Sequence, residues 1–244
     1  MGLLSQISIA LGVSRKQVNI LMIGLDNSGK TTIINQMKKE EDRVTQVTPT
    51  IGYTTEKFIF NNTTFLVHDM SGQGKYRNLW ENYYKEVDGV VFVIDSNDRL
   101  RIAVICDELR LLLDHTEFNR KKIPLVVFAN KMDEKGAMTA SEISDNIGLN
   151  SINNRNWRIC ATCAITGEGL KNGFQWLLEN IRACTESKNR QLKATSVIKY
   201  DLTDKPATTI IPSSLKLKNP PENPIQSSFI HFNFNIKANA TVQL

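Results

Sequence analysis

The segment that most constrains the fold of this chain is a loop rich in glycine. It matches the pattern G-x-x-x-x-G-K-[ST] and consists of Gly24, Leu25, Asp26, Asn27, Ser28, Gly29, Lys30 and Thr31. It follows an apolar run, residues 18–24, and precedes a helical pattern, residues 30–39. In this setting backbone N–H groups face phosphate anions, Lys30 adds positive charge near the β and γ phosphates, and the Thr31 hydroxyl should bind Mg²⁺. The loop therefore predicts a phosphate site that also includes Thr32. The alternative is a glycine-rich turn with a chance lysine.

Apolar runs rich in β-branched residues alternate with helical patterns up to residue 183. The expected strands are residues 18–24, 58–60, 64–67, 89–95, 124–130 and 157–163. The expected helices are residues 30–39, 99–113, 139–146 and 170–183. This alternation predicts an α/β fold with a mostly parallel sheet flanked by helices. The short spacing across residues 61–63 instead predicts a hairpin, so one edge pair should be antiparallel.

A second motif indicates which base the nucleotide carries. Asn130-Lys131-Met132-Asp133 follows the expected strand 124–130. The Asp133 carboxylate can accept hydrogen bonds from guanine N1 and N2, which adenine does not offer. Asn130 can tie this segment to the phosphate loop, and the aliphatic stem of Lys131 can lie on the base. Together with the phosphate loop, the motif predicts a guanine-nucleotide site that binds GTP or GDP with Mg²⁺.

Composition excludes several other classes of protein. The four cysteines are too few and too scattered for a disulfide framework, which favours reduced thiols and a cytoplasmic location. No apolar run reaches the ~18 residues of a membrane-spanning helix, and no secretory signal pattern is evident. The net charge of +5 comes from dispersed lysines and arginines, so we expect no nucleic-acid partner.

The composition changes after Ala183. No glycine follows Gly173, and five of the seven prolines lie in the last sixty or so residues. We therefore expect a low-complexity, disordered tail over residues 184–244, after a globular domain at 18–183. Residues 230–237 alternate apolar and polar side chains, as in a strand, although an incidental apolar segment in a flexible tail is the favoured explanation.

With these motifs in place, the chain resembles small GTPases of the ADP-ribosylation factor (Arf) family over residues 1–183. The resemblance implies the small-GTPase form of the P-loop NTPase fold, with a six-stranded sheet. Pro49-Thr50-Ile51-Gly52 resembles switch I, in which Thr50 would close on Mg²⁺ and the γ-phosphate. Asp69-Met70-Ser71-Gly72-Gln73 resembles switch II. There Asp69 would hold Mg²⁺ through water, the Gly72 N–H would meet the γ-phosphate, and Gln73 would be the catalytic residue that orients the attacking water.

The loop that closes over guanine can be placed in two ways. Cys160-Ala161-Thr162 and Cys163-Ala164-Ile165 both resemble the family's motif. Counting back from Gly167-Glu168-Gly169-Leu170, which resembles the start of the last helix in Arf proteins, favours the second. The resemblance then implies that the Ala164 N–H meets guanine O6.

The segment 69–80 looks most like the Arf-like subfamily that recruits the BBSome coat to ciliary membranes. Two residues depart from the general Arf pattern: Ser71 replaces a glycine, and His68 replaces a tryptophan beside Tyr53 and Tyr83. We expect nucleotide binding to survive the first change because Gly72 is retained, and we expect His68 to be a half-buried packing residue.

Residues 1–17 are expected to form an amphipathic helix. Leu3, Leu4, Ile7 and Leu11 recur at helical spacing, so this helix could lie on a membrane or pack on the domain. We do not expect Gly2 to be myristoylated, because Gln6 stands where the motif needs Ser or Thr.

The resemblance implies the partners and the location of such a switch. It implies docking on the membrane in the GTP state, coat or effector binding through the two switches, a GTPase-activating protein and an exchange factor. The implied location is cytoplasmic and peripheral on membranes, at the cilium or basal body.

The sequence is compatible with three functions. The leading one is a slowly GTP-hydrolysing trafficking switch. The second is a nucleotide-stabilised adaptor with negligible hydrolysis, suggested by the altered switch II at Ser71. An ATP-dependent kinase is disfavoured because no acceptor-binding lid segment is evident and Asp133 selects against adenine.

Overall fold

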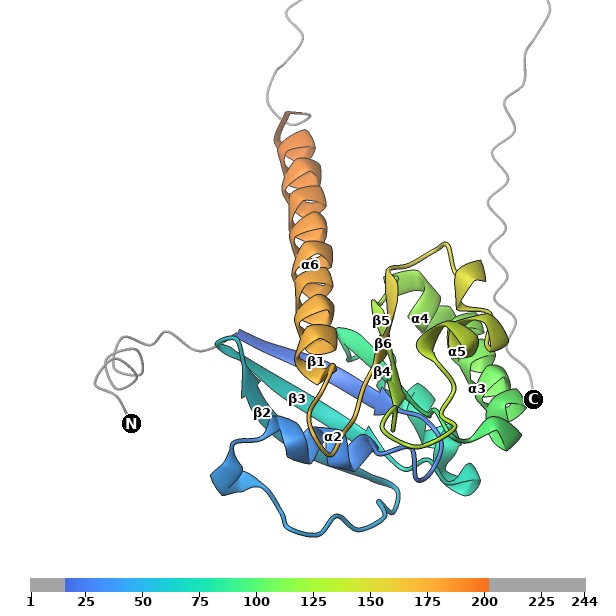
Figure 1. Ribbon diagram of the computed structural model, residues 1–244. Coiled ribbons are helices and arrows are strands. Elements are labelled where there is room, and N and C mark those ends of the chain that lie inside the picture. Colours follow the sequence, from blue (N-terminus) through green and yellow to red (C-terminus); the bar gives the residue numbers. More distant parts are fainter. Residues whose placement is uncertain (1–15, 202–244) are drawn as a thin grey trace, which may run out of the picture. The chain divides into compact units, whose positions relative to one another are not determined.

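The computed structural model describes residues 16–201, which form a six-stranded sheet with helices on both faces (Figure 1). These residues belong almost entirely to the first of two units, Met1–Lys199 and Tyr200–Leu244. The amphipathic helix expected within residues 1–17 therefore lies outside the described residues, except that Lys16 and Gln17 are already part of the first strand. The strand-like pattern at 230–237 also lies outside them.

The sheet has the strand order β2-β3-β1-β4-β5-β6. Its strands are β1 (Lys16–Ile23), β2 (Tyr53–Phe60), β3 (Thr63–Met70), β4 (Gly89–Asp95), β5 (Leu125–Asn130) and β6 (Trp157–Ala161). Only β2 is antiparallel to its neighbour, which confirms the mostly parallel sheet and the hairpin at its edge. Asn61 and Asn62 form the turn, both with positive φ, as a two-residue hairpin of type I′ requires.

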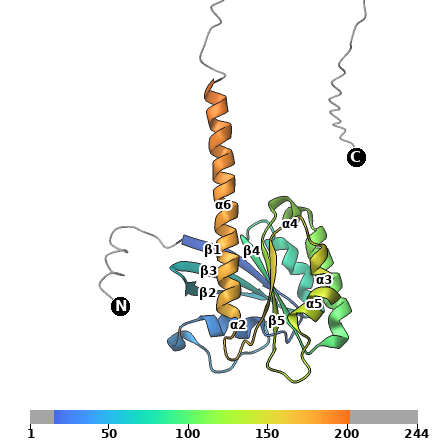
Figure 2. The same ribbon diagram turned by 45° about the horizontal axis from the view of Figure 1, so that its top comes forward.

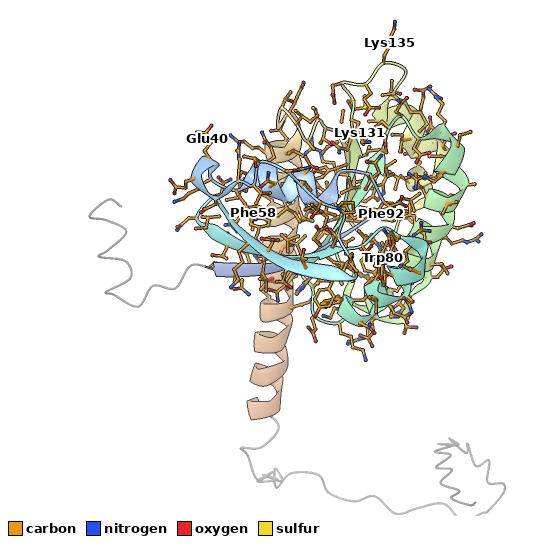
Figure 3. All side chains as sticks on the ribbon, turned by 90° about the horizontal axis from the view of Figure 1, so that it is seen from below. Glu40, Phe58, Trp80, Phe92, Lys131 and Lys135 are labelled. Carbon is orange, nitrogen blue, oxygen red and sulfur yellow. The ribbon has the colours of Figure 1, made fainter. Side chains whose placement is uncertain are left out.

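Two apolar cores lie on opposite faces of the sheet. Helices α3 (Ile102–Asp114), α4 (Thr116–Lys121) and α5 (Ala140–Asn146) cover one face, and α2 (Lys30–Met37) and α6 (Leu170–Asp201) cover the other (Figure 2). Phe92 packs in the first core and Phe58 in the second, whereas Lys135 points outward (Figure 3). Burial on both sides explains why β4 and β5 read as unbroken apolar runs.

Short 3₁₀ segments connect several elements. They are η1 (Glu40–Asp42), η2 (Gly74–Tyr83), η3 (Arg99–Arg101) and η4 (Leu149–Ser151). The helix expected at 99–113 is thus split into η3 and α3. Neither η2 nor α4 was expected.

The last helix is longer than the sequence suggested. α6 continues through Asp201, so the expectation of a disordered tail beginning at 184 is wrong for residues 184–201. The part of α6 that packs on the sheet is shorter, because Ile181 is buried whereas Glu186, Ser187 and Lys188 are exposed. Residues 202–244 lie outside the described part of the chain. Within that part, no helix is long and apolar enough to cross a membrane.

Candidate nucleotide-binding site

The sequence-predicted site residues gather at one edge of the sheet. β1, β3, β4, β5 and β6 are parallel, so their carboxyl ends meet there, and the loops that follow them face one another. The chain leaves β1 toward the β2–β3 side and later crosses to β4 on the other side. Open α/β sheets bind ligands at such a switch point.

The phosphate loop, residues 24–31, is closed by a tight contact at Gly29. Gly29 has φ 95°, and a Cβ at this position would overlap Asn130 Nδ2. Glycine is therefore required both by the backbone conformation and by the close approach of the base-reading segment. The next residue begins α2, so the N-terminus of that helix faces the loop.

Lys30 is buried inside this loop, with 6% of its surface exposed. Its Nζ donates to the backbone oxygens of Gly24 (3.0 Å) and Leu25 (2.8 Å). Burial lowers the pKa of Lys30 to about 8, and the nearby Asp69 carboxylate opposes that change. Because burial outweighs the effect of Asp69, a phosphate group would further stabilise the charged form of Lys30.

Three oxygen-bearing side chains converge beside Lys30. Thr31 Oγ1 donates to Asp69 Oδ2 (2.6 Å) and lies 3.0 Å from Thr50 Oγ1. Asp69 Oδ1 is buried and has no hydrogen-bond partner in the described structure. Burial raises the pKa of Asp69, and the hydrogen bond from Thr31 opposes the rise. Hydroxyl and carboxylate oxygens suit Mg²⁺, which keeps several waters and shares phosphate oxygens, so these residues fit the expected metal.

Removing the metal is expected to speed nucleotide release. Chelation of Mg²⁺ with EDTA should raise the dissociation rate of a fluorescent GDP analogue by about tenfold or more, because the phosphates lose their bridge to Thr31. Stopped-flow fluorescence measures the rate. A rate that EDTA leaves unchanged would contradict the assignment of this oxygen cluster as a magnesium site.

A cavity of about 320 Å³ joins the phosphate loop to both switches. Its lining residues are Asp26, Asn27, Gly29, Lys30, Thr31, Thr32, Val47, Thr48, Pro49, Thr50, Ser71, Gly72 and Gln73. The structure thus brings Thr32, Thr50, Gly72 and Gln73 together, as the sequence suggested. Their individual contacts with nucleotide stay predictions.

Gly72 packs directly on the phosphate loop. A Cβ at Gly72 would overlap Asp26 N and Leu25 C, both backbone atoms that cannot move aside cheaply. Switch II can therefore reach this position only with glycine at residue 72.

Substitution of Gly72 with alanine should consequently block this closed arrangement. We expect Gly72→Ala to lower the preference for GTP over GDP by about tenfold, because closure contributes only when a γ-phosphate is present. Titration with both nucleotides measures the ratio, and Gly74→Ala is the matched control because a Cβ there meets nothing within 4 Å. An unchanged ratio in Gly72→Ala would contradict the role of Gly72.

Asn130 links the base-reading segment to two other loops. Its Nδ2 donates to Ser28 O (2.8 Å), and its Oδ1 accepts from the Ala164 N–H (3.0 Å). Lys131 follows in a left-handed conformation, with its Nζ paired to Asp95 Oδ2 at 2.7 Å. The expected link between Asn130 and the phosphate loop is confirmed.

The two candidates for the guanine-closing loop lie in different places. Cys160 and Ala161 belong to β6, whereas Cys163 and Ala164 are buried in the loop after it, beside Asn130. A hydrogen bond with Cys163 holds the pKa of Asp133 below its usual value. The geometry therefore favours Cys163-Ala164-Ile165. The Ala164 N–H is paired with Asn130 here, so guanine O6 would have to share that donor, and the Ile165 side chain is exposed.

His68 and Ser71, the two departures from the general Arf pattern, are both packed. His68 is half-buried as expected, and its ring lies 4.7 Å from that of Tyr83 between centroids. Ser71 is buried, its Oγ accepts from the Gln73 N–H (3.4 Å), and its backbone oxygen accepts from Trp80 Nε1 (3.2 Å).

Two arginines that the sequence reasoning missed bind backbone oxygens around the site. Arg77 Nε donates to Gly72 O (2.8 Å), and its Nη1 pairs with Glu108 Oε1 on α3 (2.9 Å). Arg101 bonds to Asp26 in the phosphate loop. Arg77 lies within the segment 69–80, but the pattern of that segment gave it no role. No motif pointed to Arg101, because its contact with Asp26 joins segments 75 residues apart.

Comparisons with known proteins agree with this geometry. The model of the ADP-ribosylation factor family matches residues 4–181. "ADP-ribosylation factor-like protein 6" of Danio rerio is 50% identical over 183 residues, which cover 75% of this chain and 98% of that protein. The protein of the same name in Caenorhabditis elegans is 46% identical over 188 residues, covering 77% and 99%. A solved structure, the Arl6 BBS3 small GTPase of Trypanosoma brucei with the bound nucleotide analogue GppNp, matches with TM-score 0.65 and 40% identity, over 69% of this chain and 99% of that one.

Proposed function

The chain belongs to the ADP-ribosylation factor family, and from this premise we propose that it is a slowly GTP-hydrolysing switch that recruits a trafficking coat to membranes in its GTP state. The observation that carries the proposal is the convergence of Lys30, Thr31, Thr50, Gly72 and Gln73 on one cavity. Asn130 ties that cavity to the base-reading segment.

The two nucleotides would differ in the contacts they offer. Thr50 and Gly72 can bond to a γ-phosphate, whereas GDP leaves them without that partner. A ligand shifts a conformational equilibrium only through such a differential interaction. Switch I and switch II would therefore be closed with GTP and open with GDP.

Calorimetry with GTP, GDP and ATP in the presence of Mg²⁺ tests the nucleotide assignment. We expect both guanine nucleotides to bind at least ~10³-fold more tightly than ATP, because adenine would leave the Asp133 carboxylate unpaired. Comparable affinity for ATP would refute guanine selectivity.

For the biological role, we propose recruitment of the BBSome coat to ciliary membranes. The support is the resemblance of residues 69–80 together with the relatives named as factor-like protein 6 and as BBS3. Residues 1–15, which the structure does not describe, would supply the membrane contact, as their apolar spacing indicates.

A pulldown from ciliated-cell extract tests this role. Gln73→Leu should hold the GTP state and retain BBSome subunits, whereas Thr31→Asn should not, because it removes a hydroxyl that the metal needs. Equal capture by the two variants would contradict recruitment that depends on the nucleotide.

The adaptor with negligible hydrolysis remains the second candidate. Ser71 Oγ accepts from the Gln73 N–H, a contact that a glycine at residue 71 could not make. This contact could hold Gln73 away from the attacking water. Hydrolysis measurements on Gln73→Leu separate the two functions.

A further inference from the structure

The phosphate loop carries a negative charge at a place where phosphate anions are expected. Asp26 lies within the loop and lines the same cavity as Lys30 and Thr31. An unpaired carboxylate there would repel the phosphates of a nucleotide, and a triphosphate more than a diphosphate. A positively charged group must therefore offset the Asp26 carboxylate if the site is to prefer GTP over GDP.

Arg101 is placed to do so. Its Nη1 donates to Asp26 Oδ1 (2.9 Å) and its Nη2 to the backbone oxygen of Asp26 (3.2 Å). Asp98 orients the same guanidinium, because Arg101 Nε donates to Asp98 Oδ2 (2.5 Å). Asp98 also accepts from the Arg101 N–H and so caps η3. Arg101 therefore reaches the loop from the start of α3 with all three guanidinium nitrogens engaged.

Asp26, the residue that Arg101 binds, is also one of the residues on which switch II closes. A Cβ on Gly72 would overlap the backbone nitrogen of Asp26, so the two peptides are in contact. Arg101 bonds to the backbone oxygen of that same residue. A shift of Asp26 would therefore displace the surface that Gly72 contacts in the closed state.

We propose that Arg101 is a positioning residue of the nucleotide site: it neutralises the Asp26 carboxylate and fixes the Asp26 peptide, and thereby sets the preference for GTP over GDP. The inference rests on the proposed function. In this arrangement Arg101 differs from an arginine finger, because each guanidinium nitrogen already donates a hydrogen bond to Asp26 or Asp98.

The charge itself provides the test. In Arg101→Gln we expect the Kd for GppNp to rise about tenfold and the Kd for GDP about threefold, since the freed carboxylate acts more strongly on the more highly charged ligand. Adding Asp26→Asn removes the carboxylate and should restore most of the GppNp affinity. Arg101→Lys keeps the positive charge but loses the bidentate contact with Asp26. Its Kd for GppNp should lie between those of the wild type and Arg101→Gln. Fluorescent nucleotide titration at two salt concentrations measures all four proteins, and thermal unfolding shows that each is folded.

Arg110→Gln is the matched control, because it breaks an exposed ion pair with Asp107 on the same helix. It should leave both Kd values unchanged. An equal loss for both nucleotides in Arg101→Gln, or a loss that Asp26→Asn does not reverse, would overturn the proposal. A normal Kd with a hydrolysis rate reduced by ~10³-fold would overturn it too, and would make Arg101 a finger. If the wild-type protein bound neither nucleotide, the proposed function would fail instead.

Discussion

Replacing Asp133 with asparagine is expected to weaken GTP binding by ~10³-fold. The carboxylate can accept from both N1–H and the exocyclic N2 group of guanine, whereas an amide offers one acceptor and turns a donor toward the base. A hydrogen bond with Cys163 lowers the pKa of Asp133 from its usual value, so the residue is a carboxylate at neutral pH. Titration with a fluorescent GTP analogue measures the loss.

Binding of xanthosine triphosphate provides a second test of base recognition by residue 133. Xanthine carries a carbonyl oxygen where guanine carries the N2 amine, so Asp133→Asn should bind it more tightly than the wild type does. Asp114→Asn, at an exposed carboxylate at the end of α3, is the control and should behave as wild type. If Asp133→Asn retained wild-type GTP affinity, the base would have to be read elsewhere.

Replacing Gln73 with leucine is expected to reduce activator-stimulated hydrolysis by ~10²-fold or more while leaving GTP affinity within about threefold of wild type. The side chain lies in the cavity beside Thr50 and Gly72, where it can orient the attacking water. Leucine has a similar size but cannot hydrogen-bond to water. Single-turnover assays, with and without cell extract as a source of activator, measure both rates.

The same assay decides between switch and adaptor. An activator that supplies an arginine can add ~10³–10⁵ in rate, so a switch should respond strongly to the extract and Gln73→Leu should not. Asn78→Leu, at an exposed position of η2, is the control. If wild type and Gln73→Leu stayed equally inert in extract, the protein would be an adaptor.

The parts of the fold that sequence predicted are those set by local pattern. The strand before the phosphate loop, the helix after it and the hairpin at Asn61 each depend on adjacent residues. The phosphate loop and Asn130 could be assigned because each motif has a fixed order of functional groups. The link between them followed from the parallel sheet, which brings the carboxyl ends of β1 and β5 to one edge.

The failures have identifiable causes. The proline content of the tail as a whole predicts an end of the domain at Ala183, yet the first proline after that point is Pro206, so nothing interrupts α6 before Asp201. η2 was missed because 3₁₀ turns repeat every three residues and leave no 3.6-residue apolar pattern. Arg101 was missed because its contact with Asp26 depends on how η3 follows β4.

The Asn130 side chain bonds both to the phosphate loop at Ser28 and to the loop at Ala164, and so connects the two ends of the nucleotide site. Guanosine and pyrophosphate can be regarded as two fragments of one bivalent ligand, and each would contact a loop that bonds to the Asn130 amide. The two fragments are then expected to bind cooperatively, because either one orders a side chain that the other also needs. The three connected segments are the phosphate loop, the base-reading segment and the loop at Ala164. An exchange factor would need to disturb only one of them to release both ends of the ligand.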